Sequence, residues 1–455
     1  MPTLTLPSAS LRPILLTTTL TLPPLFLLLR SVLCPASPKD STPTPSPQST
    51  LLPTLSPFEI TSLPYPPDFY PGARDVRTPY GRIRAYEFGP EGGKKVLFVH
   101  GISTSSPVFW GLAWGLVEKG YRVLLFDLPG RGYSEAVLDL PHDSRMYTSI
   151  MLYVLASSPL NWLTTTSSSS SLSAPPSSEQ GIHIIGYSLG GAHSTVFTTQ
   201  FPALVSSLTL LAPAGLLRIP YPSLTSRLLY PSNTWLPDWL VRTIVKGRMG
   251  GWAWAPSWPW WRGRWSKDPK AAAAGATVEN HGYISPVPTS EPEGLAEEAA
   301  TSATSPSSSP AATATATAPA RDQPPPHPHP QQQRSRTGPP PNIPAIIAHQ
   351  LQHHTAFIPS FISSMRHAPL SSQTTTYALL APLLKPLIIV STTDPIVKAA
   401  EYVPDATAAL GGPEHLEVRV LEGGGHEFAF TRAEEVVALI SSRLAVRTRA
   451  VLGSD

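Results

Sequence analysis

Short, continuous apolar runs recur along the chain and predict strands that are buried on both faces. These runs occupy residues 95–99, 121–126, 182–185, 208–211, 386–390 and 416–421. Helical segments are predicted between and after them, at residues 109–119, 145–156, 189–200, 399–410 and 432–444. Two further strands, at residues 74–78 and 82–88, form a predicted hairpin. Since strand and helix alternate, the pattern predicts an α/β fold with a mostly parallel central sheet flanked by helices.

Proline, serine and threonine are concentrated in segments that lack the apolar side chains of a core. Residues 1–71 and 286–344 hold more than half of the 55 prolines. We expect a linker at residues 36–57 and solvated insertions at about 164–180 and 268–344, because burial would not offset the entropy lost on ordering them.

The N-terminal segment contains a candidate targeting signal. Residues 13–29 form an uncharged, Leu- and Thr-rich stretch between Arg12 and Arg30. Its length and flanking residues are compatible with a signal anchor, a cleaved signal peptide or an organelle transit peptide. The alternative is that this segment is a disordered tail. A membrane-associated or secretory location is therefore favoured, and organelle import stays open.

The charge and cysteine content exclude several classes of partner and cofactor. A net charge of +3, from 33 basic and 30 acidic residues, gives no reason to expect a nucleic-acid partner. The single cysteine, Cys34, excludes an intrachain disulfide and a CxxC site. His327 and His329 belong to a Pro/His/Gln tract that is typical of low complexity rather than of a metal site. No cofactor and no metal are expected.

A serine lies in the pattern of an activated nucleophile. Residues 186–190 read Gly-Tyr-Ser-Leu-Gly and fall between a predicted strand and a predicted helix. This GxSxG context holds the serine hydroxyl out on a sharp turn, so we expect Ser188 to be a nucleophile, against the alternative of a structural turn serine. The N–H of Leu189, at the start of the helix, is a candidate oxyanion donor, and Ile102, after His100 and Gly101, supplies the second.

A serine nucleophile needs a base and an orienting carboxylate, and both follow later strands. Asp394 and His426 complete the order Ser, Asp, His. Asp405 is the weaker substitute for Asp394. His183 and His193 are expected to serve packing, and His100 to bond the loop backbone.

With these motifs the chain resembles the α/β-hydrolase superfamily, in the branch that carries a cap inserted after the sixth strand. The resemblance covers residues 73–215 and 376–447. It implies core at 59–215 and 376–455 and a cap at 216–375, and the composition of residues 1–58 predicts a targeting or anchor segment plus linker before the core. Serine at position 188 argues against the haloalkane dehalogenase and epoxide hydrolase relatives, and the lipase-type HGGG loop is missing after His100. Trp110 and Tyr187 are expected to contact the substrate.

The cap region combines tryptophan with basic residues. Eight of the 11 tryptophans lie between Trp235 and Trp265, interleaved with Arg and Lys. We favour a cap whose tryptophans line an apolar acyl pocket over one that docks on a membrane interface. Either arrangement predicts an apolar substrate.

The sequence thus predicts a serine hydrolase that cleaves an ester or related acyl bond of an apolar, lipid-like small molecule. The alternatives are a noncatalytic hydrolase-fold binding protein, and a carbon–carbon or amide hydrolase on the same triad. Membrane association would use the N-terminal segment or the Trp-rich cap.

Overall fold

The computed structural model describes residues 42–163, 181–218, 229–230, 236–250 and 339–452, and all of them belong to one compact unit. The candidate signal at 13–29, the insertion at 164–180 and the low-complexity part of the cap lie outside the described residues. Within the described part, no helix is both long and apolar enough to cross a membrane. The membrane and targeting expectations, and the domain boundaries, therefore stay predictions.

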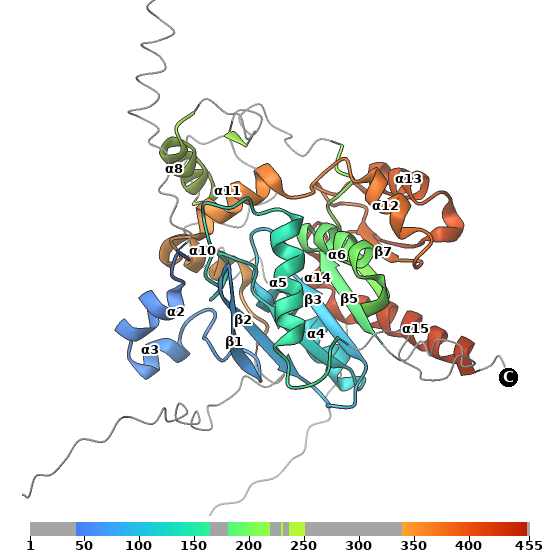
Figure 1. Ribbon diagram of the computed structural model, residues 1–455, viewed down its shortest axis with the longest axis horizontal. Coiled ribbons are helices and arrows are strands. Elements are labelled where there is room, and N and C mark those ends of the chain that lie inside the picture. Colours follow the sequence, from blue (N-terminus) through green and yellow to red (C-terminus); the bar gives the residue numbers. More distant parts are fainter. Residues whose placement is uncertain (1–41, 164–180, 219–228, 231–235, 251–338, 453–455) are drawn as a thin grey trace, which may run out of the picture. The chain divides into compact units, whose positions relative to one another are not determined.

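An eight-stranded sheet forms the centre of the described fold (Figure 1). Its spatial order is β1-β2-β4-β3-β5-β6-β7-β8. The strands are β1 (Ala73–Thr78), β2 (Gly81–Phe88), β3 (Lys95–Val99), β4 (Arg122–Phe126), β5 (Ile182–Tyr187), β6 (Val205–Leu211), β7 (Leu387–Ser391) and β8 (Glu417–Leu421). β2 pairs antiparallel with β1 and β4, and the remaining pairs are parallel. The predicted α/β fold with a mostly parallel sheet is confirmed.

The continuous apolar runs are explained by helices on both faces of the sheet. Every residue of β5 and β7 is buried, whereas the edge strand β8 is buried only at Leu421. α4 (Trp110–Glu118) packs against α15 (Ala433–Leu452), and α5 (Ser144–Ala156) packs against α6 (Leu189–Gln200). α12 (Thr374–Leu380) contacts both α6 and α13 (Ala399–Ala409). The predicted helices are present, but the last one extends to Leu452 rather than 444.

The segment before the hairpin differs from the expected linker. Residues 42–57 contain α2 (Pro47–Thr50) and η1 (Leu52–Thr54), and α3 (Pro57–Thr61) follows. Ser46 and Pro47 are buried, and Thr44 pairs with Ala136. The linker interpretation is wrong for these residues, because a high proline content does not show where in a helix each proline lies. Each of the three short helices has proline in its first turn. Proline is compatible with this position because its φ is already near the helical value and the N–H it lacks would have no partner within the helix.

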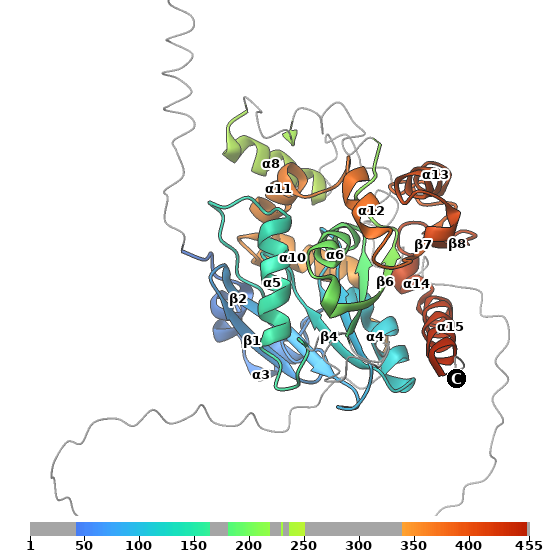
Figure 2. The same cartoon turned by 45° about the vertical axis from the view of Figure 1, so that its right-hand side comes forward.

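Three helices of the predicted cap are described: α8 (Asp238–Met249), α10 (Ile343–His353) and α11 (Phe357–His367). α8 and α11 lie side by side at one end of the fold (Figures 1 and 2). α10 and α11 bond to the turn after β4: Gly132 N–H donates to Gln350 Oε1 at 2.7 Å, and Arg131 Nη2 donates to Ser364 Oγ at 3.1 Å.

Close approach of α11 also fixes the residue at position 130. Gly130 has φ +74°, and a Cβ there would lie 2.2 Å from Ser360 Oγ. A side chain at this position would therefore push α11 away from the turn.

Candidate active site

Ser188 occupies a sharp turn between β5 and α6. Its φ of 53° and ψ of −118° are unfavourable for a residue with a side chain. The turn is held by backbone bonds: Ser188 N–H donates to Leu211 O, and the carbonyl of Ser188 accepts from Gly191 and Ala214. At Gly190 a Cβ would lie 2.0 Å from the Val99 carbonyl oxygen, so only glycine permits this contact between α6 and β3.

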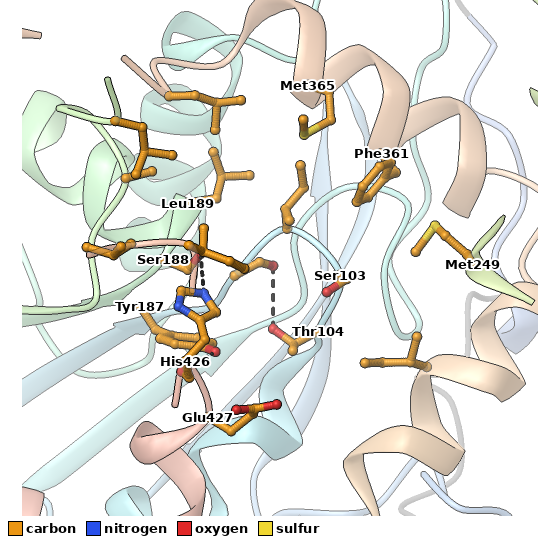
Figure 3. Close-up of a pocket in the computed structure, with 18 of the residues that line it drawn as sticks. Ser103, Thr104, Tyr187, Ser188, Leu189, Met249, Phe361, Met365, His426 and Glu427 are labelled. Atoms are coloured by element: carbon orange, nitrogen blue, oxygen red, sulfur yellow. Dashed lines mark hydrogen bonds between the residues drawn. The ribbon is translucent and has the colours of Figure 1, made fainter. Parts of the chain in front are cut away.

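The structure brings Ser188, His426 and Asp394 together at the carboxyl ends of β5, β8 and β7. His426 Nε2 lies 3.1 Å from Ser188 Oγ, and its Nδ1 lies 2.7 Å from Asp394 Oδ2 (Figure 3 shows the Ser188–His426 bond). Asp394 and His426 are only 3% and 6% exposed. Two consecutive hydrogen bonds thus connect the Asp394 carboxylate to the Ser188 hydroxyl through the imidazole of His426.

Asp394 is held so that its carboxylate orients the imidazole. Its Oδ1 accepts the N–H groups of Ile396 and Val397 at 2.8 and 2.9 Å, which leaves Oδ2 for His426. Because a carboxylate accepts, Nδ1 carries the proton, and Nε2 of the neutral ring faces Ser188 as an acceptor. The Tyr187 hydroxyl donates to the His426 carbonyl at 3.1 Å and fixes the backbone of the same residue.

Asp405, the alternative candidate for the orienting carboxylate, does not lie beside His426 in the structure. Asp405 lies on α13 and pairs with Arg218 at 2.7 Å. This hydrogen-bonded ion pair lowers the pKa of Asp405. The structure therefore brings Asp394, and not Asp405, to His426.

His100 orients the loop that carries the candidate oxyanion donor Ile102. Leu128 N–H donates to His100 Nε2 at 2.9 Å, so the proton is on Nδ1, which donates to the Gly101 carbonyl at 2.8 Å. Burial lowers the pKa of His100 to about 3, so the ring is neutral. In a trans peptide the Ile102 N–H points away from that anchored carbonyl. Arg131 Nε donates to Ile102 O at 2.9 Å and anchors the next peptide.

A cavity opens over Ser188, with about 1170 Å³ of empty space, part of it open to solvent. Its walls come from the core loops and from the cap helices α8, α10 and α11 (Figure 3). The wall is mainly apolar, formed by Ile102, Tyr187, Leu189, Ala214, Leu217, Tyr230, Val245, Met249, Ile343, Ile347, Phe361, Met365, Leu370, Ile396, Val397 and Phe430. Ile102, Leu189 and Tyr187 line the cavity together with Ser188, and the substrate contact of Tyr187 stays a prediction. The donor role of Ile102 and Leu189 stays a prediction.

The structure does not bring Trp110 to this cavity. Trp110 begins α4, and a Cβ on the adjacent Gly111 would meet Ala433 of α15, so this end of α4 packs against the C-terminal helix. The 3-10 helix η2 (Ser106–Phe109) separates Trp110 from the lining residues Gly101, Ile102, Ser103 and Thr104.

The cap wall contains aliphatic, Phe and Met side chains that the sequence analysis did not single out. The signal was present as helical spacing, since Phe361 and Met365 lie one turn apart on α11 and share a face. Trp239 of α8 is 58% exposed and does not line the cavity, and the other seven tryptophans of the cluster lie outside the described residues. In the described region no cluster of His, Cys, Asp and Glu could hold a metal ion.

Residues 96–439 match the Alpha/beta hydrolase family, so the chain belongs to the α/β-hydrolase family. A serine hydrolase-like protein of Danio rerio is 28% identical over 140 residues, 30% of this chain and 37% of that protein. Monoacylglycerol lipase abhd6-B of Xenopus laevis is 28% identical over 152 residues, 32% of this chain and 40% of that protein. The matches span less than half of either relative. A carboxylesterase structure from Nitrososphaera gargenis aligns at 13% identity and TM-score 0.47, covering 83% of this chain and 100% of that one.

Four buried histidines predict sensitivity of the fold to acid. Burial lowers the pKa of His100 and His193 to about 3, and that of His142 and His354 to about 4. A histidine of the unfolded chain titrates near ~6.5, so below that pH the unfolded state binds more protons than the folded state. The free energy of unfolding should therefore fall as the pH drops from about 6.5 towards 4, by up to about 1.4 kcal/mol per pH unit for each histidine.

Urea unfolding between about pH 7 and about pH 5 measures this slope. The matched variant is His193→Gln, whose amide does not titrate; His193 is fully buried against Tyr147, with ring centroids 4.1 Å apart. The unfolding free energy of His193→Gln should fall less steeply with decreasing pH, because one proton fewer is taken up on unfolding, which corresponds to a slope smaller by up to about 1.4 kcal/mol per pH unit. Equal slopes in the two proteins would contradict the assignment of His193.

Proposed function

We propose that this chain is a serine hydrolase that cleaves an ester or related acyl bond through Ser188, His426 and Asp394. The observation that carries the proposal is the position of His426, whose two ring nitrogens lie 3.1 Å from Ser188 Oγ and 2.7 Å from Asp394 Oδ2 beside an apolar cavity. Membership of the α/β-hydrolase family supports the same class of reaction.

In the proposed reaction, Ser188 Oγ attacks the acyl carbon while its proton passes to His426 Nε2. The negative charge that develops on the carbonyl oxygen is stabilised by the N–H groups of Ile102 and Leu189. Collapse of this intermediate transfers the proton to the leaving alcohol and leaves an acyl-enzyme. Water then attacks the acyl carbon with His426 again as the base, and the acid leaves as Ser188 is restored. Asp394 stabilises the imidazolium at both stages.

The wall of the cavity favours an apolar acyl substrate. Aliphatic, Phe and Met side chains cover most of it, and these surfaces gain most from burying a hydrocarbon chain. The Xenopus relative is named a monoacylglycerol lipase, and a monoacylglycerol is an acyl ester of this kind. We therefore place esters with a medium or long acyl chain first among the substrates.

Replacing the nucleophile tests the reaction class. Ser188→Ala should lower kcat/KM for aryl esters by a factor on the order of 10⁴ or more, because no other atom takes the place of Oγ. Ester turnover measures the loss of activity, and thermal melting of the same preparation checks that the variant is folded. Ser149→Ala on α5, whose hydroxyl bonds only to the helix carbonyl of Arg145 among the described residues, is the matched control and should keep full activity. Undiminished turnover in Ser188→Ala would contradict the proposal.

A pair of amide substitutions tests the orienting carboxylate. Asp394→Asn should lower kcat by a factor on the order of 10⁴, because an amide in this position stabilises the wrong imidazole tautomer. Asp405→Asn removes only the exposed ion pair with Arg218 and should leave kcat near that of the parent. Steady-state kinetics of the two variants decide between the carboxylates. If Asp394→Asn kept the parent kcat while Asp405→Asn lost activity, then Asp405 and not Asp394 would be the carboxylate that orients His426.

A further inference from the structure

Two charged side chains besides the candidate triad line the cavity, Glu427 and Arg248. Glu427 follows His426 and lies on that side of the pocket, across from Met249 (Figure 3), whereas Arg248 has no hydrogen-bond partner for its outer nitrogens among the described residues. Arg248, from the last turn of α8, lines the cavity and is 9% exposed. Its Nη1 and Nη2 atoms are both buried, and neither has a hydrogen-bond partner among the described residues. A guanidinium keeps its charge and has five N–H donors, so leaving it unpaired in an apolar wall is strongly unfavourable.

Arg131, which is also buried, has partners for every nitrogen of its guanidinium group. Arg131 is fully buried, and its guanidinium donates to the carbonyls of Ile102 and Pro129 and to hydroxyls of Tyr147 and Ser364. Those bonds join the oxyanion loop to cap helix α11. Arg248 is 9% exposed, against 0% for Arg131, and lacks such partners in the described part of the chain. Because Arg248 lines the cavity, a ligand bound there can supply the partner that the described residues do not.

The place of α8 separates this cation from the reacting atoms. Met249, the neighbour of Arg248 in α8, lies across the drawn pocket from Ser188 and His426 (Figure 3). The apolar residues of α10 and α11 contribute wall to the same cavity. A molecule that reached from Ser188 to Arg248 would therefore have a reactive carbonyl at one end, a hydrocarbon part in the middle and an anion at the other.

We propose that Arg248 binds an oxyanion of the substrate, a carboxylate or a phosphate, and so selects amphipathic acyl esters that carry a negative charge away from the scissile bond. The proposal rests on the proposed function for the identity of the reacting end. Guanidinium matches both anions through two parallel N–H···O bonds, and in an apolar wall such charge-assisted bonds give strong selectivity.

Matched ester pairs test the selectivity in the full chain. On the acyl side, aryl esters of a fatty acid are compared with aryl monoesters of the dicarboxylic acid of equal length, over a graded series of tail lengths. On the alcohol side, a 1-acylglycerol is compared with its 3-phosphate. The parent protein should show a higher kcat/KM for the anionic member of at least one pair, and the pair that shows it identifies the anion and the side of the ester.

Substitutions then assign the preference to Arg248. Arg248→Met keeps an unbranched stem and removes the charge, and it should lower the anionic-to-neutral ratio of kcat/KM by about 10- to 100-fold. Arg248→Lys should retain part of the ratio, since it keeps charge without the fork. Lys246→Met is the matched control, because Lys246 is exposed on the same helix and should leave the ratio unchanged. An unchanged ratio in Arg248→Met, or a parent protein that prefers neutral esters in every pair, would overturn the proposal.

A binding measurement separates this proposal from the reaction itself. Calorimetric titration of the Ser188→Ala protein with octyl phosphate and with octanol requires no turnover. Tighter binding of octyl phosphate, lost on adding Arg248→Met, supports the anion site even if no ester is hydrolysed by the parent. Equal affinity for the two compounds refutes the anion site, while Ser188-dependent ester hydrolysis would still support the proposed function.

Discussion

The geometry of the candidate site depends on one constraint: the carboxyl ends of parallel strands meet at the same edge of the sheet. β5, β7 and β8 are parallel to their neighbours, so Ser188, Asp394 and His426 follow strands that end together. Chain segments more than 200 residues apart are thereby brought within hydrogen-bond distance, as in the 3.1 Å contact between His426 and Ser188. The buried apolar strands fix the positions, and short loops carry the polar groups.

The cap helices are attached to the same edge of the sheet by hydrogen bonds to the turn that follows β4. Asp127 is fully buried and accepts the N–H groups of Tyr133 at 3.0 Å, which closes the turn, and of Ser106 at 2.9 Å, which ties the turn to η2. Arg131 and Gly132 of the turn then bond to cap helices α11 and α10. The wall of the cavity is consequently attached to the loop that carries Ile102, so one hydrogen-bonded network sets the positions of both.

Much of this could be predicted from the sequence, for identifiable reasons. Buried strands such as β5 are continuous apolar runs, and the turn at Ser188 requires glycine where α6 approaches β3. Those signals are local. Helical spacing places Phe361 and Met365 on one face but does not show that this face lines the cavity. Arg248, which has no hydrogen-bond partner for its outer nitrogens among the described residues, could not be singled out, because its place depends on the packing of α8 and α11. The position of Trp110 outside the cavity also depends on packing, here of α4 against α15.

The central claim is that His426 activates Ser188 in the folded protein. Labelling of the full chain with a fluorophosphonate probe, followed by mass spectrometry of the modified peptide, tests it directly, because the phosphorus atom is attacked only by an activated serine. The account predicts one adduct on Ser188, absent in Ser188→Ala and strongly reduced in His426→Ala. A folded parent protein that takes no label would contradict the account and favour a noncatalytic binding protein of the same fold. Labelling on another serine would contradict the assignment of Ser188 as the nucleophile.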